Sequence, residues 1–249
     1  MQEDTNSPNM DLKPGLTEKM TREAIILAGG FGTRLQKVIP DVPKPMALVN
    51  KLPFLSYLLE ELNNHGFTRA ILATGYRHEQ IESYFGEIYK NIRLSYSVEN
   101  EPLGTGGAIE LASRLIQTDC FFVINGDTLF RVDYTEMEKT FIELNSNLVV
   151  ALKEMKNFDR YGSVITRGRR IIAFNEKKFC KNGFINGGIY LIRKDWLMNN
   201  LPSGIFSFEK DILGKKAGKE EISCYKSEGY FIDIGIPEDY ERAKKELRI

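Results

Sequence analysis

The sequence predicts a Rossmann-like α/β protein, with helices on both faces of a mixed, mainly parallel sheet. Two patterns support this prediction. Short apolar runs alternate with amphipathic helical segments, which is typical of strand–helix–strand units with right-handed crossovers. The first apolar run also leads directly into a glycine-rich loop, and open α/β sheets bind ligands at the carboxyl ends of their strands.

Composition limits the classes of protein and partner. The 249 residues fit one large domain or two small ones, and a hydrophobic fraction of 42% is enough for a sizeable core. Lysine plus arginine and aspartate plus glutamate both number 34, so the net charge is zero. A neutral chain argues against nucleic acid and anionic membranes as partners, and any cationic site is expected inside a pocket.

Hydropathy and cysteine content predict a cytoplasmic protein. No apolar run reaches membrane-spanning length, and the N-terminus lacks the apolar core of a secretory signal. The three cysteines are scattered without a Cys-x-x-Cys pair, which argues against a disulfide framework or a zinc site. With two histidines in the chain, any metal is expected to bind carboxylates.

The pattern of polar and apolar residues changes twice along the chain. Residues 1–22 are polar with little periodicity and predict a mobile N-terminal arm. Residues 23–249 predict a single domain with two halves, because full helices separate the strands of 23–150 whereas turns separate the short strands of 151–249.

The chain is organised around the loop that follows its first buried strand, Ala24 to Ala28. Gly29, Gly30 and Gly32 allow backbone N–H groups to approach an anion closely, and Arg34 adds a planar fork of donors suited to phosphate. No Gly-Lys-Ser/Thr follows, so the loop is not a P-loop, and its spacing differs from the dinucleotide-binding fingerprint. We therefore predict a nucleoside triphosphate cradle; the alternative is a tight turn after a strand.

Prolines hold the next segment extended and present a lysine. Lys44 lies between Pro43 and Pro45, and proline fixes φ and biases the preceding residue away from helix. The lysine is therefore predicted to face phosphate from a rigid segment, with an ordinary surface lysine as the alternative.

Most other elements follow from periodicity and end signals. Leucines at helical spacing after Pro53 predict a helix over 53–65, and the same amphipathic pattern predicts helices over 77–85 and 133–144. Apolar or alternating runs predict strands at 69–74, 92–98, 119–124 and 147–152. The second half predicts a helix over 206–213 capped by Ser207, a final helix from Pro237, and short strands at 162–166, 170–175, 184–192 and 230–235.

Three glycines open one more helix, which runs to about residue 116. Gly104, Gly106 and Gly107 are costly at a helix N-terminus, so something flat or bulky is expected to lie against the backbone there. A loose capping turn is the alternative.

Two isolated aspartates in or after apolar strands predict a metal site. Asp127 ends the run Asn125-Gly126-Asp127 after the strand at 119–124, and Asp233 lies in the apolar run 230–235. Carboxylates together with phosphates are the usual way a protein holds Mg²⁺, so we expect Mg²⁺ at these residues. For Asn125-Gly126-Asp127 the alternative is an ordinary polar turn.

In the second half, one apolar strand contains an amide and two glycines. Gly187 and Gly188 follow Asn186 and weaken the strand, so they need a physical reason. Close approach of a hydroxylated ligand is one reason, and a β-bulge is the alternative. Another strand closes with Glu176 beside Lys177.

The chain resembles the sugar-1-phosphate nucleotidyltransferases in an ordered set of motifs that covers nearly all of it from Ala24 onward: GGFGTRL, PKPM, EPLGTGGA, NGD, FNEKK, INGGIYL and FIDIG. The resemblance implies their GT-A-like, three-layer α/β/α fold. EPLGTGG resembles the guanylyltransferases of this family, and bacterial D-glycero-α-D-manno-heptose 1-phosphate guanylyltransferases are similar in DRYGSV, INGGIYL and FIDIGIPEDY. Lys178 stands where the family usually has proline, and the left-handed β-helix tail of some relatives is absent.

The resemblance implies a reaction in which GMP passes from GTP to D-glycero-α-D-manno-heptose 1-phosphate, with Mg²⁺ as cofactor. The products are pyrophosphate and GDP-heptose, for surface polysaccharide or S-layer glycans. Enzymatic alternatives are a mannose-1-phosphate guanylyltransferase, a hexose-1-phosphate uridylyl- or thymidylyltransferase, and a glycosyltransferase; a nucleotide-sugar sensor is the non-enzymatic one. The complete set of charged residues disfavours a sensor, and the lack of Asp-x-Asp near Asp127 disfavours a glycosyltransferase. A homo-oligomer is one option for the assembly.

The same resemblance assigns roles to individual residues, with nucleotide bound by residues 23–150 and sugar phosphate by residues 151–249. The catalytic set is Arg34, Lys44, Asp127, Lys177 and Asp233, of which Asp127 and Asp233 would hold the metal. The nucleotide-binding set is Leu27, Ala28, Gly29, Gly30, Gly32, Thr33, Arg34, Gly75, Glu99, Gly104, Thr105 and Gly126. The sugar-phosphate set is Tyr161, Gly162, Glu176, Lys177, Asn186 and Gly188.

Overall fold

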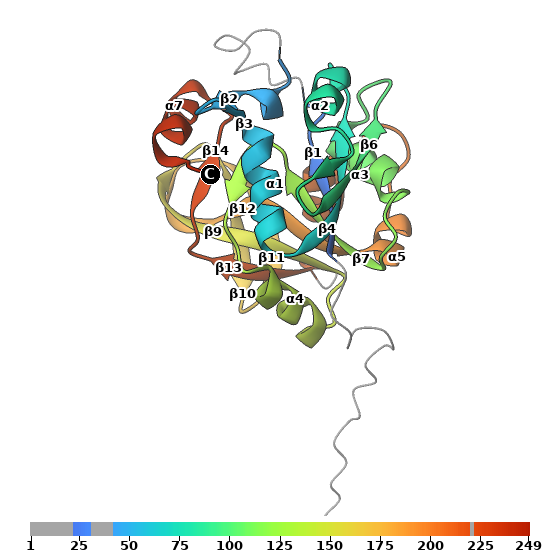
Figure 1. Cartoon of the computed structure of the whole chain (residues 1–249). Helices are drawn as coiled ribbons and strands as arrows, with labels where there is room; N and C mark the ends of the chain where they lie inside the picture. Colours follow the sequence, from blue (N-terminus) through green and yellow to red (C-terminus); the bar gives the residue numbers. More distant parts are fainter. Residues whose placement is uncertain (1–21, 31–41, 220–221) are drawn as a thin grey trace, which may run out of the picture.

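The computed structural model describes residues 22–30, 42–219 and 222–249, and Figure 1 shows its ribbon. The predicted N-terminal arm apart from Arg22, and the predicted loop residues Gly32, Thr33 and Arg34, lie outside the described residues. The described part contains a ten-stranded mixed sheet, two small two-stranded sheets and helices. No helix within these ranges is long and apolar enough to cross a membrane.

Parallel pairing organises the first half of the large sheet. Its strands run in the order β7-β1-β4-β6, and each neighbouring pair is parallel. The strands are β1 (Arg22–Leu27), β4 (Phe67–Thr74), β6 (Ile92–Val98) and β7 (Cys120–Asn125), with β5 (Ile88–Tyr89) antiparallel to β6 at the edge. Because parallel strands end at the same edge, the loops that follow β1 and β7 begin side by side.

Four α-helices of the first half begin and end within three residues of the predicted bounds. They are α1 (Phe54–Asn64), α2 (His78–Phe85), α3 (Gly104–Ser113) and α4 (Tyr134–Glu143). Asp133 caps α4, because its carboxylate accepts from the backbone N–H groups of Thr135 and Glu136. Before α1 come the short helical turn η1 (Lys44–Met46) and the paired strands β2 (Leu48–Val49) and β3 (Leu52–Pro53).

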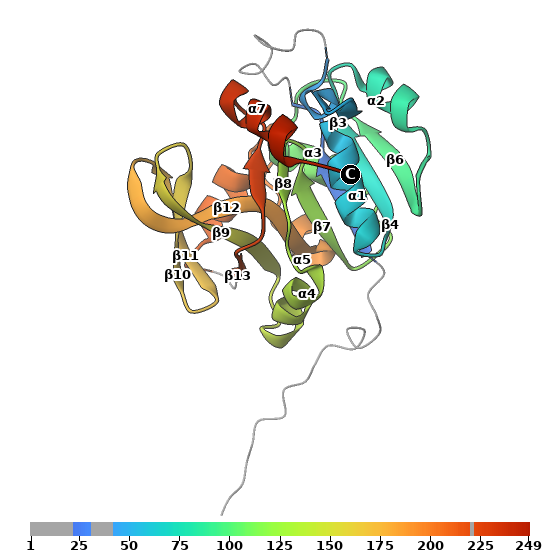
Figure 2. The ribbon, with the colours of Figure 1, turned by 60° about the vertical axis from the view of Figure 1, so that its left-hand side comes forward.

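Antiparallel pairing organises the second half, which corrects the expectation of a mainly parallel sheet. β12 (Cys180–Arg193) lies antiparallel between β7 and β9 (Leu148–Phe158), and β13 (Ile222–Ser227) pairs parallel with β9. β11 (Arg170–Lys177) and β10 (Gly162–Arg167) follow, and β10 also pairs with β12. Turns rather than crossover helices join most of these strands, and a turn leaves its two strands antiparallel. Figure 2 shows β9, β10 and β11 on the side away from α1 and β4.

The remaining helical segments are α5 (Lys194–Met198), η2 (Phe208–Leu213), α6 (Gly214–Lys216) and α7 (Pro237–Glu246). Ser207 caps η2 as predicted, because its hydroxyl accepts from the backbone N–H of Lys210, although η2 has π-helical rather than α-helical geometry. Pro237 stands in the first turn of α7, also as predicted.

The two faces of the sheet bury separate hydrophobic clusters. Neighbouring residues of a strand point to opposite faces, so Ile26 and Phe122 belong to one cluster while Ile25 and Phe121 belong to the other. Residues of α1, α2, α4 and α7 complete the first cluster, and residues of α3, α5 and η2 complete the second. Helices therefore cover both faces, which confirms the predicted three-layer α/β/α class.

A small two-stranded sheet joins the two halves of the chain. β8 (Thr128–Phe130) follows β7 directly after Asp127, and β14 (Phe231–Asp233) pairs with it in antiparallel orientation. Asp233 lies opposite Thr128, and the backbone N–H of Ile234 donates to the carbonyl oxygen of Asp127 (3.0 Å). This pairing brings the two predicted metal ligands together from opposite halves of the sequence.

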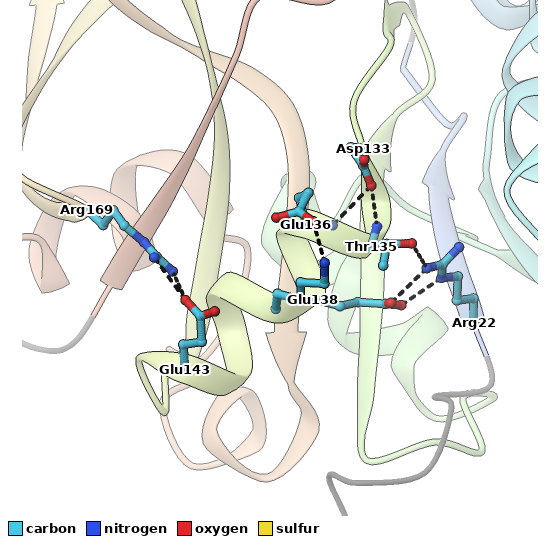
Figure 3. A network of polar contacts seen from close by, with 8 residues as sticks. Arg22, Asp133, Thr135, Glu136, Glu138, Glu143 and Arg169 are labelled. Atoms are coloured by element: carbon cyan, nitrogen blue, oxygen red, sulfur yellow. Dashed lines mark hydrogen bonds and ion pairs between the residues drawn. The ribbon is translucent and has the colours of Figure 1, made fainter.

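The predicted N-terminal arm extends one residue too far, because Arg22 is the first residue of β1. Its guanidinium donates to both carboxylate oxygens of Glu138 (2.7 Å each) and to the hydroxyl of Thr135 (2.8 Å), both on α4. Figure 3 shows this network. The bidentate ion pair fastens the start of the first strand to α4.

The next side chain, Glu23, is expected to contribute strongly to stability. Glu23 is 2% exposed; its Oε2 accepts from the backbone N–H groups of Gln117 (2.6 Å) and Thr118 (3.1 Å), and Arg69 donates to Oε1 (3.2 Å). Glu23→Ala leaves these donors without their acceptor. We expect the free energy of unfolding, measured in urea, to fall by about 3 kcal/mol.

The matched control for this prediction is Glu143→Ala. Glu143 pairs with Arg169 at the surface, as Figure 3 shows, and exposed ion pairs contribute about 0–1 kcal/mol. Equal losses of stability in the two variants would show that burial of the Glu23 network does not matter.

Candidate active site

A pocket of about 480 Å³ opens at the carboxyl ends of β1, β4 and β7. Ligand sites typically enclose roughly 300–1,000 Å³. The predicted catalytic residues Lys44 and Asp127 line the pocket. Of the described residues in the predicted nucleotide-binding set, Ala28 is not in the lining, because it is 1% exposed and its N–H donates to the carbonyl of Ala73. The others line the pocket: Leu27, Gly29, Gly30, Gly75, Glu99, Gly104, Thr105 and Gly126.

Two of these glycines allow strand ends to meet at the pocket wall. The N–H of Gly126 donates to the carbonyl of Leu27 (3.0 Å), and a Cβ on Gly126 would stand 2.3 Å from that oxygen. A Cβ on Gly29 would stand 3.3 Å from the backbone of Thr74. Strand packing therefore requires small residues here, and it leaves the backbone at the ends of β1 and β7 close to one ligand site.

The flat group expected against the glycines of α3 comes from the protein itself. A Cβ on Gly106 would stand 2.1 Å from the ring of Phe206, and one on Gly104 would stand 2.4 Å from the Phe206 carbonyl oxygen. The N–H of Gly106 donates to this oxygen (3.0 Å), and a Cβ on Gly107 would stand 2.6 Å from Leu103. Packing within the chain thus accounts for all three glycines, although Gly104 also lines the pocket.

Gly106→Ala is therefore expected to destabilise the protein. The added methyl group collides with the ring of Phe206, which is 4% exposed and has little room to move. Overpacking costs about 1–3 kcal/mol, so the melting temperature should fall by roughly 2–12 °C.

Gly214→Ala is the matched control for this substitution. Gly214 has helical dihedral angles (φ −64°, ψ −39°), and its Cβ position is 3.4 Å from the carbonyl oxygen of Glu209. Alanine in such a position restricts the unfolded chain, so the control should melt at or slightly above the wild-type temperature. A control that melts as early as Gly106→Ala would argue against the clash.

One ammonium group lies between the two predicted metal ligands. Lys44 Nζ is 2.5 Å from Asp127 Oδ2 and 3.9 Å from Asp233 Oδ1, and the Lys44 side chain is 12% exposed. Burial, and next the negative charge of Asp127, raise the pKa of Asp233 above its ordinary value, while the charge of Lys44 acts in the opposite direction. Lys44, Asp127 and Asp233 thus form one electrostatic unit beside the pocket.

Neighbouring donors hold the two carboxylates in place. The hydroxyl of Thr128 donates to Asp127 Oδ1 (3.1 Å), and the hydroxyl of Tyr161 donates to Asp233 Oδ2 (3.3 Å). The backbone N–H of Gly235 donates to Asp233 Oδ1 (2.6 Å). Each carboxylate therefore has one oxygen held by a side-chain hydroxyl and the other near Lys44.

Three glutamates also line the pocket: Glu99, Glu101 and Glu209. Glu209 Oε2 accepts from the hydroxyls of Thr105 (2.7 Å) and Ser207 (3.0 Å), so it joins α3 to the start of η2. Glu99 is half-buried, and this burial raises the pKa of its carboxyl group. Its Oε2 accepts a long hydrogen bond from the backbone N–H of Leu103 (3.5 Å). Glu99 therefore presents a partly desolvated acceptor to the pocket.

The predicted sugar-phosphate residues lie outside the described lining of this pocket. Tyr161 connects them to the site through its contact with Asp233. Gly162, the next residue, begins β10 and pairs with Lys177 of β11, so Lys177 lies on the neighbouring strand. Glu176 and Lys177 are exposed, and their contacts with a sugar phosphate stay a prediction.

A bulge in β12 accounts for the amide and the glycines in that strand. The register with β9 shifts between Asn186 and Tyr190, and Gly188 has φ of +75°. Asn186 Oδ1 accepts from the N–H of Gly188 (3.0 Å), and Asn186 Nδ2 donates to the hydroxyl of Tyr190 (2.8 Å). A Cβ on Gly187 would stand 2.4 Å from the ring of Phe130. The alternative of a β-bulge is confirmed, and sugar contacts by Asn186 or Gly188 stay a prediction.

Two residues outside the predicted sets also lie near the site. Asn125 lines the pocket, and its buried Oδ1 has no hydrogen-bond partner among the described residues. Arg160 pairs with Asp239 of α7 (2.5 Å), and its positive charge partly opposes the rise in the pKa of Asp233 that burial and Asp127 cause. Asn125 could have been found from the Asn-Gly-Asp run. The position of Arg160 could not, because it depends on how β14 and α7 fold against the connection between β9 and β10.

These features define a class of protein. The family described as nucleotidyl transferase matches residues 23–248, and the chain belongs to this family, as the sequence motifs predict. The chain is 50% identical to the D-glycero-alpha-D-manno-heptose 1-phosphate guanylyltransferase of Aneurinibacillus thermoaerophilus, over 91% of this chain and 98% of that protein. It is 43% identical to the protein of the same name from Campylobacter jejuni, over 88% and 96%. The crystal structure of HddC from Yersinia pseudotuberculosis complexed with GMP-PN is 38% identical with a TM-score of 0.81, over 91% of this chain and 100% of that chain.

Proposed function

We propose that this protein transfers GMP from GTP to D-glycero-α-D-manno-heptose 1-phosphate, giving GDP-heptose and pyrophosphate. The observation that carries the proposal is the cluster of Lys44, Asp127 and Asp233 beside a pocket lined by predicted nucleotide-binding residues. The names of the two relatives support guanylyl transfer to a heptose 1-phosphate, and the HddC complex with GMP-PN supports a guanine nucleotide.

The proposed reaction is a displacement at phosphorus. An oxygen of the sugar 1-phosphate attacks the α-phosphorus of GTP, and the bond from the α-phosphorus to the bridging oxygen breaks. Pyrophosphate leaves with that electron pair. A phosphate monoester is already nucleophilic, so catalysis depends on alignment and on neutralising charge rather than on a general base. Lys44 lines the pocket and can neutralise phosphate oxygens, and we assign the same role to Arg34, which lies outside the described residues.

The two aspartates suit Mg²⁺. β8 and β14 hold their carboxylates against the same ammonium group, so one cation can lie close to oxygens of both. Mg²⁺ prefers oxygen ligands and usually combines one or two carboxylates with phosphates and water. Asp127 and Asp233 would therefore hold it. When bound, Mg²⁺ would neutralise charge on the reacting phosphates.

Glu99 is the residue in the pocket that best suits recognition of guanine. The pairing edge of guanine carries two adjacent donors, N1–H and the exocyclic amine, and a carboxylate can accept from both. Glu209 already accepts from two hydroxyls, whereas Glu99 accepts one long hydrogen bond. A half-buried carboxylate without a partner is costly, so the site would discriminate against bases that lack these donors.

We assign binding of the sugar phosphate, which accepts GMP, to the predicted sugar-phosphate residues. The hydroxyl of Tyr161 contacts Asp233, and this contact supports a sugar-phosphate site next to the two aspartates. Lys177 would bind the 1-phosphate, and Glu176 and Asn186 would bind sugar hydroxyls. We place the reaction in the cytoplasm, since the three cysteines are free, as is usual in a reducing compartment.

Product analysis tests this function. The purified protein, incubated with GTP, Mg²⁺ and the heptose 1-phosphate, should form GDP-heptose detectable by mass spectrometry together with an equal amount of pyrophosphate. Excess EDTA should stop the reaction. Binding of both substrates without any GDP-heptose would contradict the proposal and favour a sensor, and a higher kcat/KM with mannose 1-phosphate would move the assignment to GDP-mannose.

A further inference from the structure

Lys44 lies between the two aspartates and the pocket proposed for the triphosphate. Its ammonium contacts Asp127 and approaches Asp233, and its side chain lines the pocket in which the triphosphate is proposed to bind. The backbone at Lys44 is held by flanking prolines and by the hydrogen bond from the N–H of Met46 to the carbonyl of Pro43 (2.8 Å). Any exchange of Lys44 between the aspartates and the triphosphate therefore involves the flexible four-carbon side chain rather than the loop.

The chain leaves space for the contact between this ammonium and the aspartates. A Cβ on Gly235 would stand 2.7 Å from Asp233 Oδ1 and 3.3 Å from Lys44 Nζ. The φ angle of Gly235 is not in the left-handed region, so the backbone conformation does not explain the glycine. The lack of a side chain at this position instead allows Lys44 and Asp233 to approach each other.

The ammonium lies beside the carboxylate oxygens that a shared metal ion would need, at 2.5 Å from Asp127 Oδ2 and 3.9 Å from Asp233 Oδ1. Thr128 and Tyr161 hold one oxygen of each carboxylate. Lys44 contacts the other oxygen of Asp127, whereas the other oxygen of Asp233 accepts from the N–H of Gly235 (2.6 Å) and lies 3.9 Å from the ammonium. A divalent cation shared by Asp127 and Asp233 would therefore stand beside the ammonium. The metal ion and the ammonium would repel each other strongly, because they would be neighbours in a place where water is partly excluded.

We propose that Lys44 is an internal counter-ion that hinders metal binding to the aspartate pair until a nucleotide binds. The triphosphate offers the ammonium new anionic partners, and once Lys44 turns toward them the facing oxygens of Asp127 and Asp233 become accessible to the metal. Metal and nucleotide then bind cooperatively, and the free protein binds metal weakly. The identities of nucleotide and metal rest on the proposed function, but the competition between Lys44 and a metal is measurable without any substrate.

Mn²⁺ binding to the free protein, followed by electron paramagnetic resonance of the unbound ion, tests this role. Lys44→Met should bind Mn²⁺ at least about tenfold more tightly than wild type, because two carboxylates then face each other without a cation. Lys44→Arg keeps the charge and should stay close to wild type. Asp127→Asn added to Lys44→Met should abolish the gain, which would locate the ion at the pair. Lys139→Met is the matched control, since Lys139 pairs with Glu136 on the surface of α4.

A folded Lys44→Met variant that binds Mn²⁺ no more tightly than wild type would overturn the proposal. Should Lys44→Met fail to fold, lysine side-chain NMR of the wild type gives the answer. The Lys44 ammonium signal, identified by its loss in Lys44→Arg, should be unchanged by Mg²⁺ alone and should shift when GTP and Mg²⁺ are added together; a shift with Mg²⁺ alone would overturn the proposal. If the wild type forms GDP-heptose but the Mn²⁺ or NMR result is contrary, the counter-ion role is rejected and the proposed function is kept. If Lys44→Met binds Mn²⁺ more tightly but the wild type forms no GDP-heptose, the counter-ion role is kept and the proposed function is rejected.

Discussion

Asp127→Asn and Asp233→Asn are each expected to lower kcat by roughly 10²–10³ while the protein stays folded. Each substitution removes one of the two negative charges proposed to hold Mg²⁺ against the reacting phosphates. Asparagine keeps the size of the side chain, and its carbonyl oxygen can still accept from Thr128 or from the N–H of Gly235. Pyrophosphate release at saturating GTP and sugar phosphate measures kcat, and thermal melting checks the fold.

Asp133→Asn is the matched control for these two variants. Asp133 caps α4 outside the pocket lining, and asparagine is about as good a helix cap as aspartate, so both activity and melting temperature should stay close to wild type. Wild-type turnover in either active-site variant, or full activity in excess EDTA, would exclude the proposed metal role of the pair.

Glu99→Gln is expected to remove most of the preference for guanine. The variant replaces an acceptor-only carboxylate with an amide whose NH₂ group faces donors of the base. Hydrogen bonds to a charged group contribute about 1.5–3 kcal/mol each, so loss of two should lower kcat/KM for GTP by roughly 10²-fold or more. Inosine triphosphate lacks the exocyclic amine, and the gap between GTP and inosine triphosphate should narrow in the variant. Steady-state kinetics with both nucleotides measures this change.

Glu101→Gln is the matched control on the same loop. Glu101 lines the pocket but is exposed, so its substitution should change kcat/KM for GTP much less. The assignment of Glu99 would be wrong if Glu101→Gln lost the preference for guanine while Glu99→Gln kept it.

Local elements could be predicted from the sequence because their signals are local. The leucine stripe after Pro53 predicts α1, the amphipathic pattern over 133–144 predicts α4, and Ser207 caps η2 as predicted. Pairing in the second half could not be predicted in the same way. Short apolar runs indicate strands, but they do not say that β12 lies antiparallel between β7 and β9. The choice of partner depends on tertiary packing, which periodicity does not encode.

The glycines show a second limit of sequence reasoning. A costly glycine indicates that space is needed, but it does not tell which group fills the space. Gly106 makes room for Phe206, where the sequence predicts something flat or bulky, and Gly187 makes room for Phe130, where a hydroxylated ligand was one of two expected reasons. At Gly235, by contrast, the space lies in the candidate active site and is occupied by the side chains of Asp233 and Lys44.

The charged residues of the site could be predicted individually, whereas their arrangement depends on β8 and β14. The sequence identifies Lys44, Asp127 and Asp233 as candidates, and the pairing of two short strands places Asp233 beside Lys44. Three-residue strands have too little periodicity to be paired from sequence. The contact of Tyr161 with Asp233 could not be predicted for the same reason.

Guanylyl transfer to a heptose 1-phosphate requires selectivity for GTP, and a comparison of nucleotides measures that selectivity. Pyrophosphate release would be measured with D-glycero-α-D-manno-heptose 1-phosphate and GTP, UTP or dTTP in turn, and kcat/KM would be determined for each. We predict that GTP is preferred by roughly 10²-fold or more, since a site that pairs with guanine leaves the half-buried carboxylate of Glu99 without its donors when another base binds. A clear preference for UTP or dTTP over GTP would contradict the assignment.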